Sequence, residues 1–187
     1  MKRTKLATVT VTCAAGTLAA VAALSTSAYA IPPEARSITI ACQDSSGALF
    51  PGVTSITGAL TSSQSSPTLP QKMKANLPVS NPVPVPPNSA AIVIRVVQTS
   101  GGGSGVGTVF DFAGTTHPFW GPVPMVLGPL AAPSVIPAGT TARFKDTTGA
   151  PPSATNWSIK IRNPVPGTGN DIYCNGKQPN GSADFSF

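Results

Sequence analysis

Charged side chains are scarce in this sequence, which has six acidic and twelve basic residues among 187. Enzymes and metal centres need several titratable or ligating groups gathered in one place. Only one histidine is present, His117, so a zinc site built from cysteine and histidine would lack ligands. We therefore expect no metal and no cofactor, and we favour a protein that is not an enzyme.

Motifs for binding phosphate or nucleic acid are also lacking. The glycine-rich stretch 101–107, GGGSGVG, matches neither a dinucleotide-binding loop nor a P-loop with its lysine. Lys72 and Lys74 are a basic pair two residues apart, and no basic stripe interleaved with aromatics accompanies them. The sequence thus predicts no nucleic-acid binding.

A nucleophile motif for hydrolysis is incomplete. Ser104 has Gly102 two residues before it, but Val106 rather than glycine two residues after it. Members of a catalytic triad are distant in sequence, and the six carboxylates could supply a glycosidase-type pair, so neither arrangement is ruled out by spacing. A small secreted hydrolase using His117 is our alternative to a non-catalytic protein.

The first thirty residues have the three parts of a secretory signal peptide. Basic residues stand at the start, an apolar run rich in alanine and threonine covers 6–24, and Ala28-Tyr29-Ala30 supplies a cleavage site. Without an Arg-Arg pair, we expect the general secretion route and cleavage after Ala30. An uncleaved anchor is the other interpretation. We predict one secreted β domain, 31–187, with no membrane span, that is extracellular or attached to the cell wall.

Cysteine usage agrees with export. Cys13 lies inside the apolar run, so we interpret it as part of the removed segment rather than as a lipidation site. Cys42 and Cys174 are the two that remain, and a cysteine pair in an exported chain usually forms a disulfide. Two free buried thiols are the alternative. The bond would join the first strand to the next-to-last one.

Short alternating apolar segments separated by turn-forming residues predict an all-β protein. Segment 90–97 is nearly apolar on both faces, which favours a central strand. Trp157, Ile159 and Ile161 share one face of another segment, whereas 61–70 is typical of a polar loop and 82–87 of an extended polyproline-like connection. We predict an antiparallel β-sandwich, immunoglobulin-like in architecture only, with long Pro/Gly-rich loops; a barrel is the second choice.

Aromatic residues cluster between the predicted strands. Phe110 and Phe112 alternate on one face, and His117, Phe119 and Trp120 follow in a predicted loop. Such loops can stack on sugars or enter a partner's groove, so His117, Phe119 and Trp120 are a candidate ligand platform. The competing interpretation, which we favour, buries Phe110 and Phe112 in the core and lets Trp120 cap one end of the domain.

The layout resembles a group of actinobacterial secreted β-sandwich proteins of unknown function. The features that carry the resemblance are the signal peptide, a first strand 38–42 ending in cysteine, proline-rich connections at 82–87 and 137–139, and the closing Cys174. The resemblance implies secretion and a β fold and brings no catalytic residues.

The predicted function is therefore a binding or structural module, secreted or associated with the cell envelope. Its partner would be an envelope component, either a polysaccharide or a protein. Self-association through an open sheet edge is a further possibility that the sequence leaves open.

Overall fold

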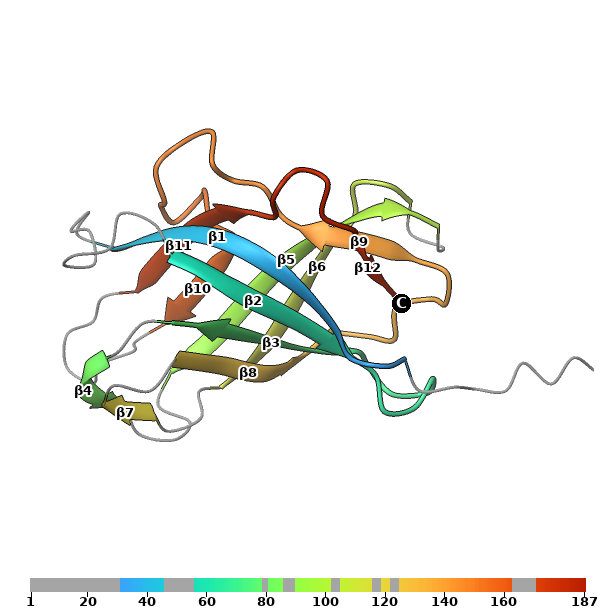
Figure 1. The fold of residues 1–187 in the computed structure, drawn as a ribbon, viewed down its shortest axis with the longest axis horizontal. Helices are drawn as coiled ribbons and strands as arrows, with labels where there is room; N and C mark the ends of the chain where they lie inside the picture. Colours follow the sequence, from blue (N-terminus) through green and yellow to red (C-terminus); the bar gives the residue numbers. More distant parts are fainter. Residues whose placement is uncertain are drawn as a thin grey trace, which may run out of the picture.

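The computed structural model describes residues 31–45, 56–78, 81–85, 90–101, 105–115, 119–121, 125–162 and 171–187. For 81–85 and 119–121 it describes the backbone alone. Every element in this part of the chain is a β-strand, and every pairing is antiparallel (Figure 1). The strands are β1 (Glu34–Asp44), β2 (Ile56–Ser63), β3 (Lys72–Leu77), β4 (Asn81–Val85), β5 (Ala91–Ser100), β6 (Val109–Thr115), β7 (Phe119–Gly121), β8 (Met125–Ala131), β9 (Thr141–Phe144), β10 (Ile159–Arg162), β11 (Ile172–Lys177) and β12 (Phe185–Ser186).

Eight of these strands close into a barrel, which differs from the expected sandwich of two separate sheets. Their order is β10-β11-β1-β2-β3-β8-β6-β5, and β5 pairs back to β10 through Ile94 opposite Ile159 and Ile92 opposite Ile161. Strand β5 is long enough to pair along one edge with β10 and then with β9. The all-β, antiparallel prediction is confirmed, as is the central position of β5.

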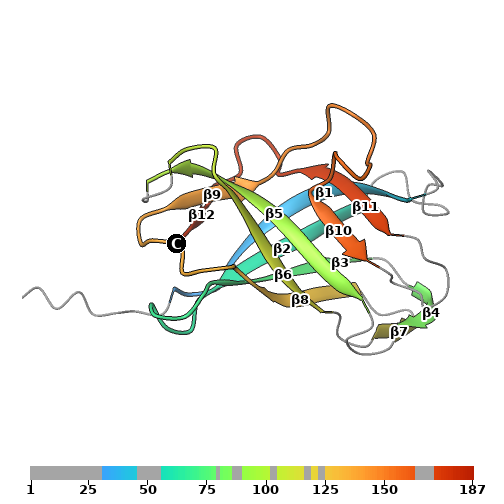
Figure 2. The same cartoon turned by 180° about the vertical axis from the view of Figure 1, so that it is seen from behind.

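The barrel is flattened into two layers that cross each other. Strands β1, β2, β3 and β8 lie in one layer, and β5, β6 and β10 lie in the other (Figures 1 and 2). The spatial order β10-β5-β6-β8 is a Greek key, because β10 returns to lie beside β5 after the run β5, β6 and β8. Each strand has one inward and one outward face, as it would in a sandwich.

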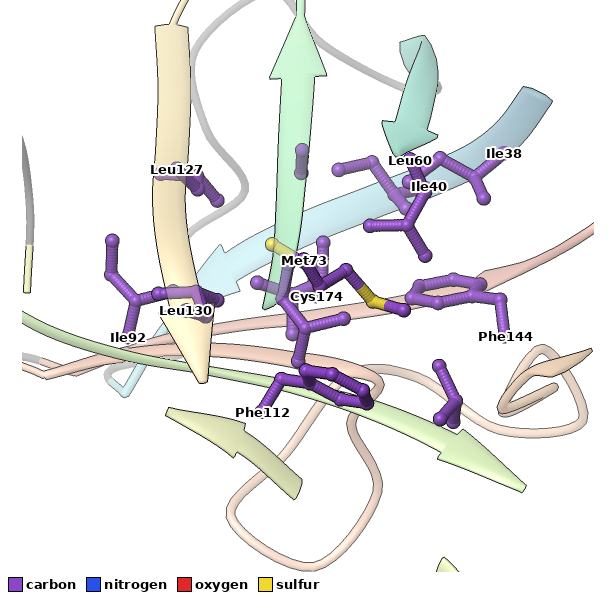
Figure 3. Packing of buried hydrophobic residues seen from close by; sticks show 14 of the residues in the cluster. Ile38, Ile40, Leu60, Met73, Ile92, Phe112, Leu127, Leu130, Phe144 and Cys174 are labelled. Atoms are coloured by element: carbon purple, nitrogen blue, oxygen red, sulfur yellow. The ribbon is translucent and has the colours of Figure 1, made fainter. Parts of the chain in front are cut away.

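Side chains fill the interior of the barrel. An eight-stranded barrel is just wide enough for its inward side chains to pack against one another. Figure 3 shows this packing, in which residues from both layers interdigitate. The largest fully buried side chains are Phe112, Phe144, Phe185, Ile38, Ile40, Leu60, Met73, Ile92, Ile94, Leu127, Leu130 and Ile159.

Buried glutamines attach loops to the barrel. The amide of Gln71 donates to the Ile136 carbonyl at 2.9 Å and accepts from the Ile136 N–H at 2.8 Å. Gln178 accepts from the Phe144 N–H at 3.2 Å and donates to the Ala183 carbonyl at 2.6 Å. These side chains satisfy backbone groups of two loops and of β9 that would otherwise be buried without partners.

Three segments differ from the predictions. Strand β2 continues to Ser63, where a polar loop from residue 61 was expected, because Thr61 and Ser63 pair with Lys74 and Lys72 of β3. Strand β4 is extended as predicted, but it pairs with β7 in a small sheet of its own. Strand β7 itself was predicted to be loop.

The disulfide prediction is confirmed. Cys42 and Cys174 are bonded with an S–S distance of 2.03 Å and a separation of 132 residues in sequence. They lie opposite each other on β1 and β11, the first strand and the next-to-last. Their Cα atoms are 4.0 Å apart, closer than the usual 5.5–6 Å or so, because directly opposed residues of neighbouring antiparallel strands approach closely.

Candidate functional site

Phe119 and Trp120 of the predicted aromatic platform belong to β7, whose small sheet with β4 lies at one end of the barrel (Figure 1). The backbone of Phe119 pairs with Val85, and that of Gly121 pairs with Asn81. His117 and the side chains of Phe119 and Trp120 lie outside the described residues. The platform therefore stays a prediction, with the backbone of Phe119 and Trp120 on a short strand rather than in a loop.

The neighbouring aromatics belong to the core, as we expected. Phe112 is fully buried, and Phe110 is nearly so. The ring of Phe112 stacks on that of Phe187 with centroids 6.2 Å apart, and Phe187 in turn stacks on Phe185 at 6.4 Å. These inward rings are part of the packing and present no surface to a ligand.

Trp157 lies outside the barrel, although the sequence placed it on one face with Ile159 and Ile161. Strand β10 begins only at Ile159, so its alternation does not extend back to Trp157. The guanidinium carbon of Arg95 lies 3.5 Å from the centroid of the indole ring, and Arg95 also pairs with Asp111 at 2.9 Å. This stacked cation covers a ring face that a sugar would need.

Tyr173 is covered in a similar way. Its ring is buried, and the ammonium of Lys160 lies 5.2 Å from the ring centroid. Lys160 is held there by Asp171 at 3.2 Å, which also accepts a hydrogen bond from the Tyr173 hydroxyl. The outer faces of β10 and β11 thus offer no open aromatic surface at these two rings.

Carboxylates in the described residues are mostly neutralised by partners. Glu34 pairs with Arg36 at 2.7 Å, and Asp184 pairs with Arg143 at 2.9 Å. Hydrogen bonds from the backbone and hydroxyl of Thr148 lower the pKa of Asp146 below its ordinary value. A general acid needs a raised pKa, so Asp146 is a turn residue, as its sequence context indicated.

Metal-ligating groups do not gather in the described part of the chain. Those residues contain no group of three or more histidine, cysteine or acidic side chains that could hold a metal ion. The same residues contain no helix long and apolar enough to cross a membrane.

Two neighbouring lysines on one strand take no part in these ion pairs. Lys72 and Lys74 are exposed on the outer face of β3, where exposed and buried residues alternate. Among the described residues, neither side chain has an ion-pair or hydrogen-bond partner. The sequence singled out the pair, and the period of two could have placed both on one face. Their surroundings depend on strand pairing that the sequence did not predict.

Comparison with known proteins gives no family for this chain: no family model, no curated protein and no solved structure matches it.

Proposed function

We propose that this protein is a secreted, non-catalytic module that binds a component of the cell envelope or forms part of it. The signal-peptide pattern of residues 1–30 supports export. The Cys42–Cys174 bond agrees with an oxidising destination. The resemblance to actinobacterial secreted β-sandwich proteins contributes one point to this proposal, that the chain is an exported antiparallel β domain.

The observation that carries the proposal is the division between the inside and the outside of the barrel. Inward positions are filled by aliphatic and aromatic side chains, which leaves recognition to the outer surface and to the end that carries β4 and β7. Four carboxylates are held in ion pairs with basic side chains, an arrangement that favours structure over acid–base chemistry.

Self-association through a sheet edge has less support. Each of the eight barrel strands has a hydrogen-bonded neighbour on both sides, so among the described strands open edges remain at the two-residue β12 and in the short β4–β7 sheet, and short edges pair poorly with other chains. We therefore propose that the partner is a different molecule, polysaccharide or protein, that meets side chains rather than backbone.

Export and attachment are tested together by fractionating a culture of the producing cells. We expect the mature chain to begin Ile-Pro-Pro-Glu at residue 31 and to sediment with the envelope. N-terminal sequencing and immunoblotting of each fraction measure both. A chain that keeps Met1 and stays in the cytosol would contradict the proposal. Release of sugar from envelopes by the wild-type protein, lost in His117→Ala, would contradict it too.

The aromatic platform makes a separate prediction. If Phe119 and Trp120 bind the partner, Trp120→Ala should leave the melting temperature nearly unchanged and abolish attachment to isolated envelopes. Trp157→Ala is the matched control, because it removes a buried indole together with its stack on Arg95 and should lower the melting temperature. A large loss of stability in Trp120→Ala would mean that this ring is packed, and would end the platform hypothesis.

A further inference from the structure

Strands β2, β3 and β8 contain no carboxylate, and in this layer Glu34 and Asp44 stand only at the two ends of β1. This layer faces the viewer in Figure 1. We call the part formed by β2, β3 and β8 the β3 face. Its outward residues are small, hydroxyl, amide or basic, with few apolar ones: Thr57, Ala59, Thr61, Ser63, Lys72, Lys74, Asn76, Val126, Pro129 and Ala131.

The basic residues elsewhere in the described chain are largely compensated. Arg36, Arg95 and Arg143 each pair with one carboxylate, and Lys160 and Arg162 share Asp171. Lys177 lies near enough to Asp146 to lower the pKa of that carboxyl further. Lys72, Lys74 and Lys145 have no such partner among the described residues, so two of the three uncompensated lysines lie side by side on the β3 face.

The geometry of the two lysines suits a repeating anion. They are alternate residues on one strand, so their Cα atoms are about 6.8 Å apart and their side chains point the same way. Opposite them on β2 are Thr61 and Ser63, and opposite Lys72 on β8 is Ala131. These short side chains leave both ammonium groups accessible from the strand's flanks.

Hydrogen-bonding groups line the same surface. Among the described residues, the side chains of Thr61, Ser63 and Asn76 have no hydrogen-bond partner, so their donors and acceptors are free for a ligand. Ammonium groups flanked by hydroxyl and amide groups are suited to a polymer that carries both anionic groups and hydroxyls. An anionic polysaccharide has this chemistry.

We propose that the β3 face binds an anionic polysaccharide through Lys72 and Lys74, an inference that rests on the proposed function and names its partner class. A lipid surface fits less well, because binding there needs large apolar side chains that insert, and the outward apolar residues are Val126, Pro129 and alanines. Single-stranded nucleic acid fits less well too, because aromatic rings for base stacking are absent from the described β3 face.

The test measures binding of the disulfide-bonded, secreted protein to polygalacturonate, a linear glycan with one carboxylate on each sugar. The test variant is Lys72→Gln with Lys74→Gln. The matched control is Lys145→Gln with Arg162→Gln, which removes the same charge from the residue after β9 and from the end of β10. We expect the test pair to weaken binding about tenfold or more and to flatten its dependence on salt by about one unit of slope per lost contact. The control should change affinity less than about twofold.

Several outcomes would overturn the inference. Equal weakening in both variants would mean that net charge alone attracts the glycan. The partner class would be wrong if the protein bound neutral dextran, vesicles rich in phosphatidylglycerol or an oligothymidylate as tightly as polygalacturonate. A protein that binds no polygalacturonate at all would also contradict it. If the wild-type protein and the lysine variant sediment equally with envelopes, this inference fails while the proposed function stands.

Discussion

Replacing Cys42 and Cys174 together by serine should lower the free energy of unfolding by about 2–5 kcal/mol. The bond encloses 132 residues, so its loss frees most of the exported chain in the unfolded state. Both positions are also buried among inward residues, where serine hydroxyls would lack partners. Urea unfolding followed by tryptophan fluorescence measures the difference.

Reduction provides the control for this experiment. In the presence of a thiol reductant, the wild-type midpoint should fall towards that of the double serine variant, while the variant itself should not respond. An oxidised wild type and a double variant with the same midpoint would refute the stabilising role. Two free thiols in the intact mass of the secreted protein would refute the bond.

Phe185→Ala should cost about 3–5 kcal/mol of stability, as for other large buried aromatics. Phe185 is fully buried, stacks on Phe187 and lies beneath the guanidinium of Arg36, 5.7 Å from the ring centroid. Arg36 also donates to the Asp184 carbonyl at 2.9 Å. The truncation would therefore leave a cavity beneath a contact that joins β12 to β1.

Two variants make the Phe185 result interpretable. Phe185→Leu keeps most of the volume and should cost less than the alanine change. Val106→Ala removes apolar atoms from a side chain that is 74% exposed and should change stability by less than about 0.5 kcal/mol. A Phe185→Ala protein as stable as Val106→Ala would mean that β12 is not packed on the barrel in solution.

Local patterns were enough to predict most strands but not their closure. Alternation with a period of two places Ile92, Ile94, Ile159 and Ile161 on buried faces in a sandwich and in a barrel alike. What separates the two folds is whether β5 pairs with β10. That contact joins segments far apart in sequence, and no local propensity encodes it.

Other differences between the predicted and the observed structure arise from interactions between residues that are distant in sequence. Trp157 follows the apolar period of β10, yet it stacks on Arg95 outside the barrel. Gln71 is polar and directly follows the predicted loop 61–70, yet it is buried because the backbone of Ile136 needs its amide. In both cases a partner from another segment determines the position of the side chain.

Only part of the candidate binding surface could be predicted from the sequence. Sequence reasoning singled out Lys72 and Lys74 as a close basic pair, and the alternation of β3 places both outward. It did not predict that Thr61, Ser63 and Ala131 would be their neighbours, because this depends on the register of β3 with β2 and β8. The lack of a carboxylate around the two lysines follows from that register.

The most direct test of the account is a map of backbone amide NMR shifts in the mature protein during titration with polygalacturonate. We predict that the largest shifts fall on β3 at Lys72 and Lys74 and on the facing residues Thr61 and Ser63, with small shifts for the inward core. Shifts centred on Phe119 to Gly121, on the outer face of β5 and β10, or nowhere would contradict recognition by the β3 face.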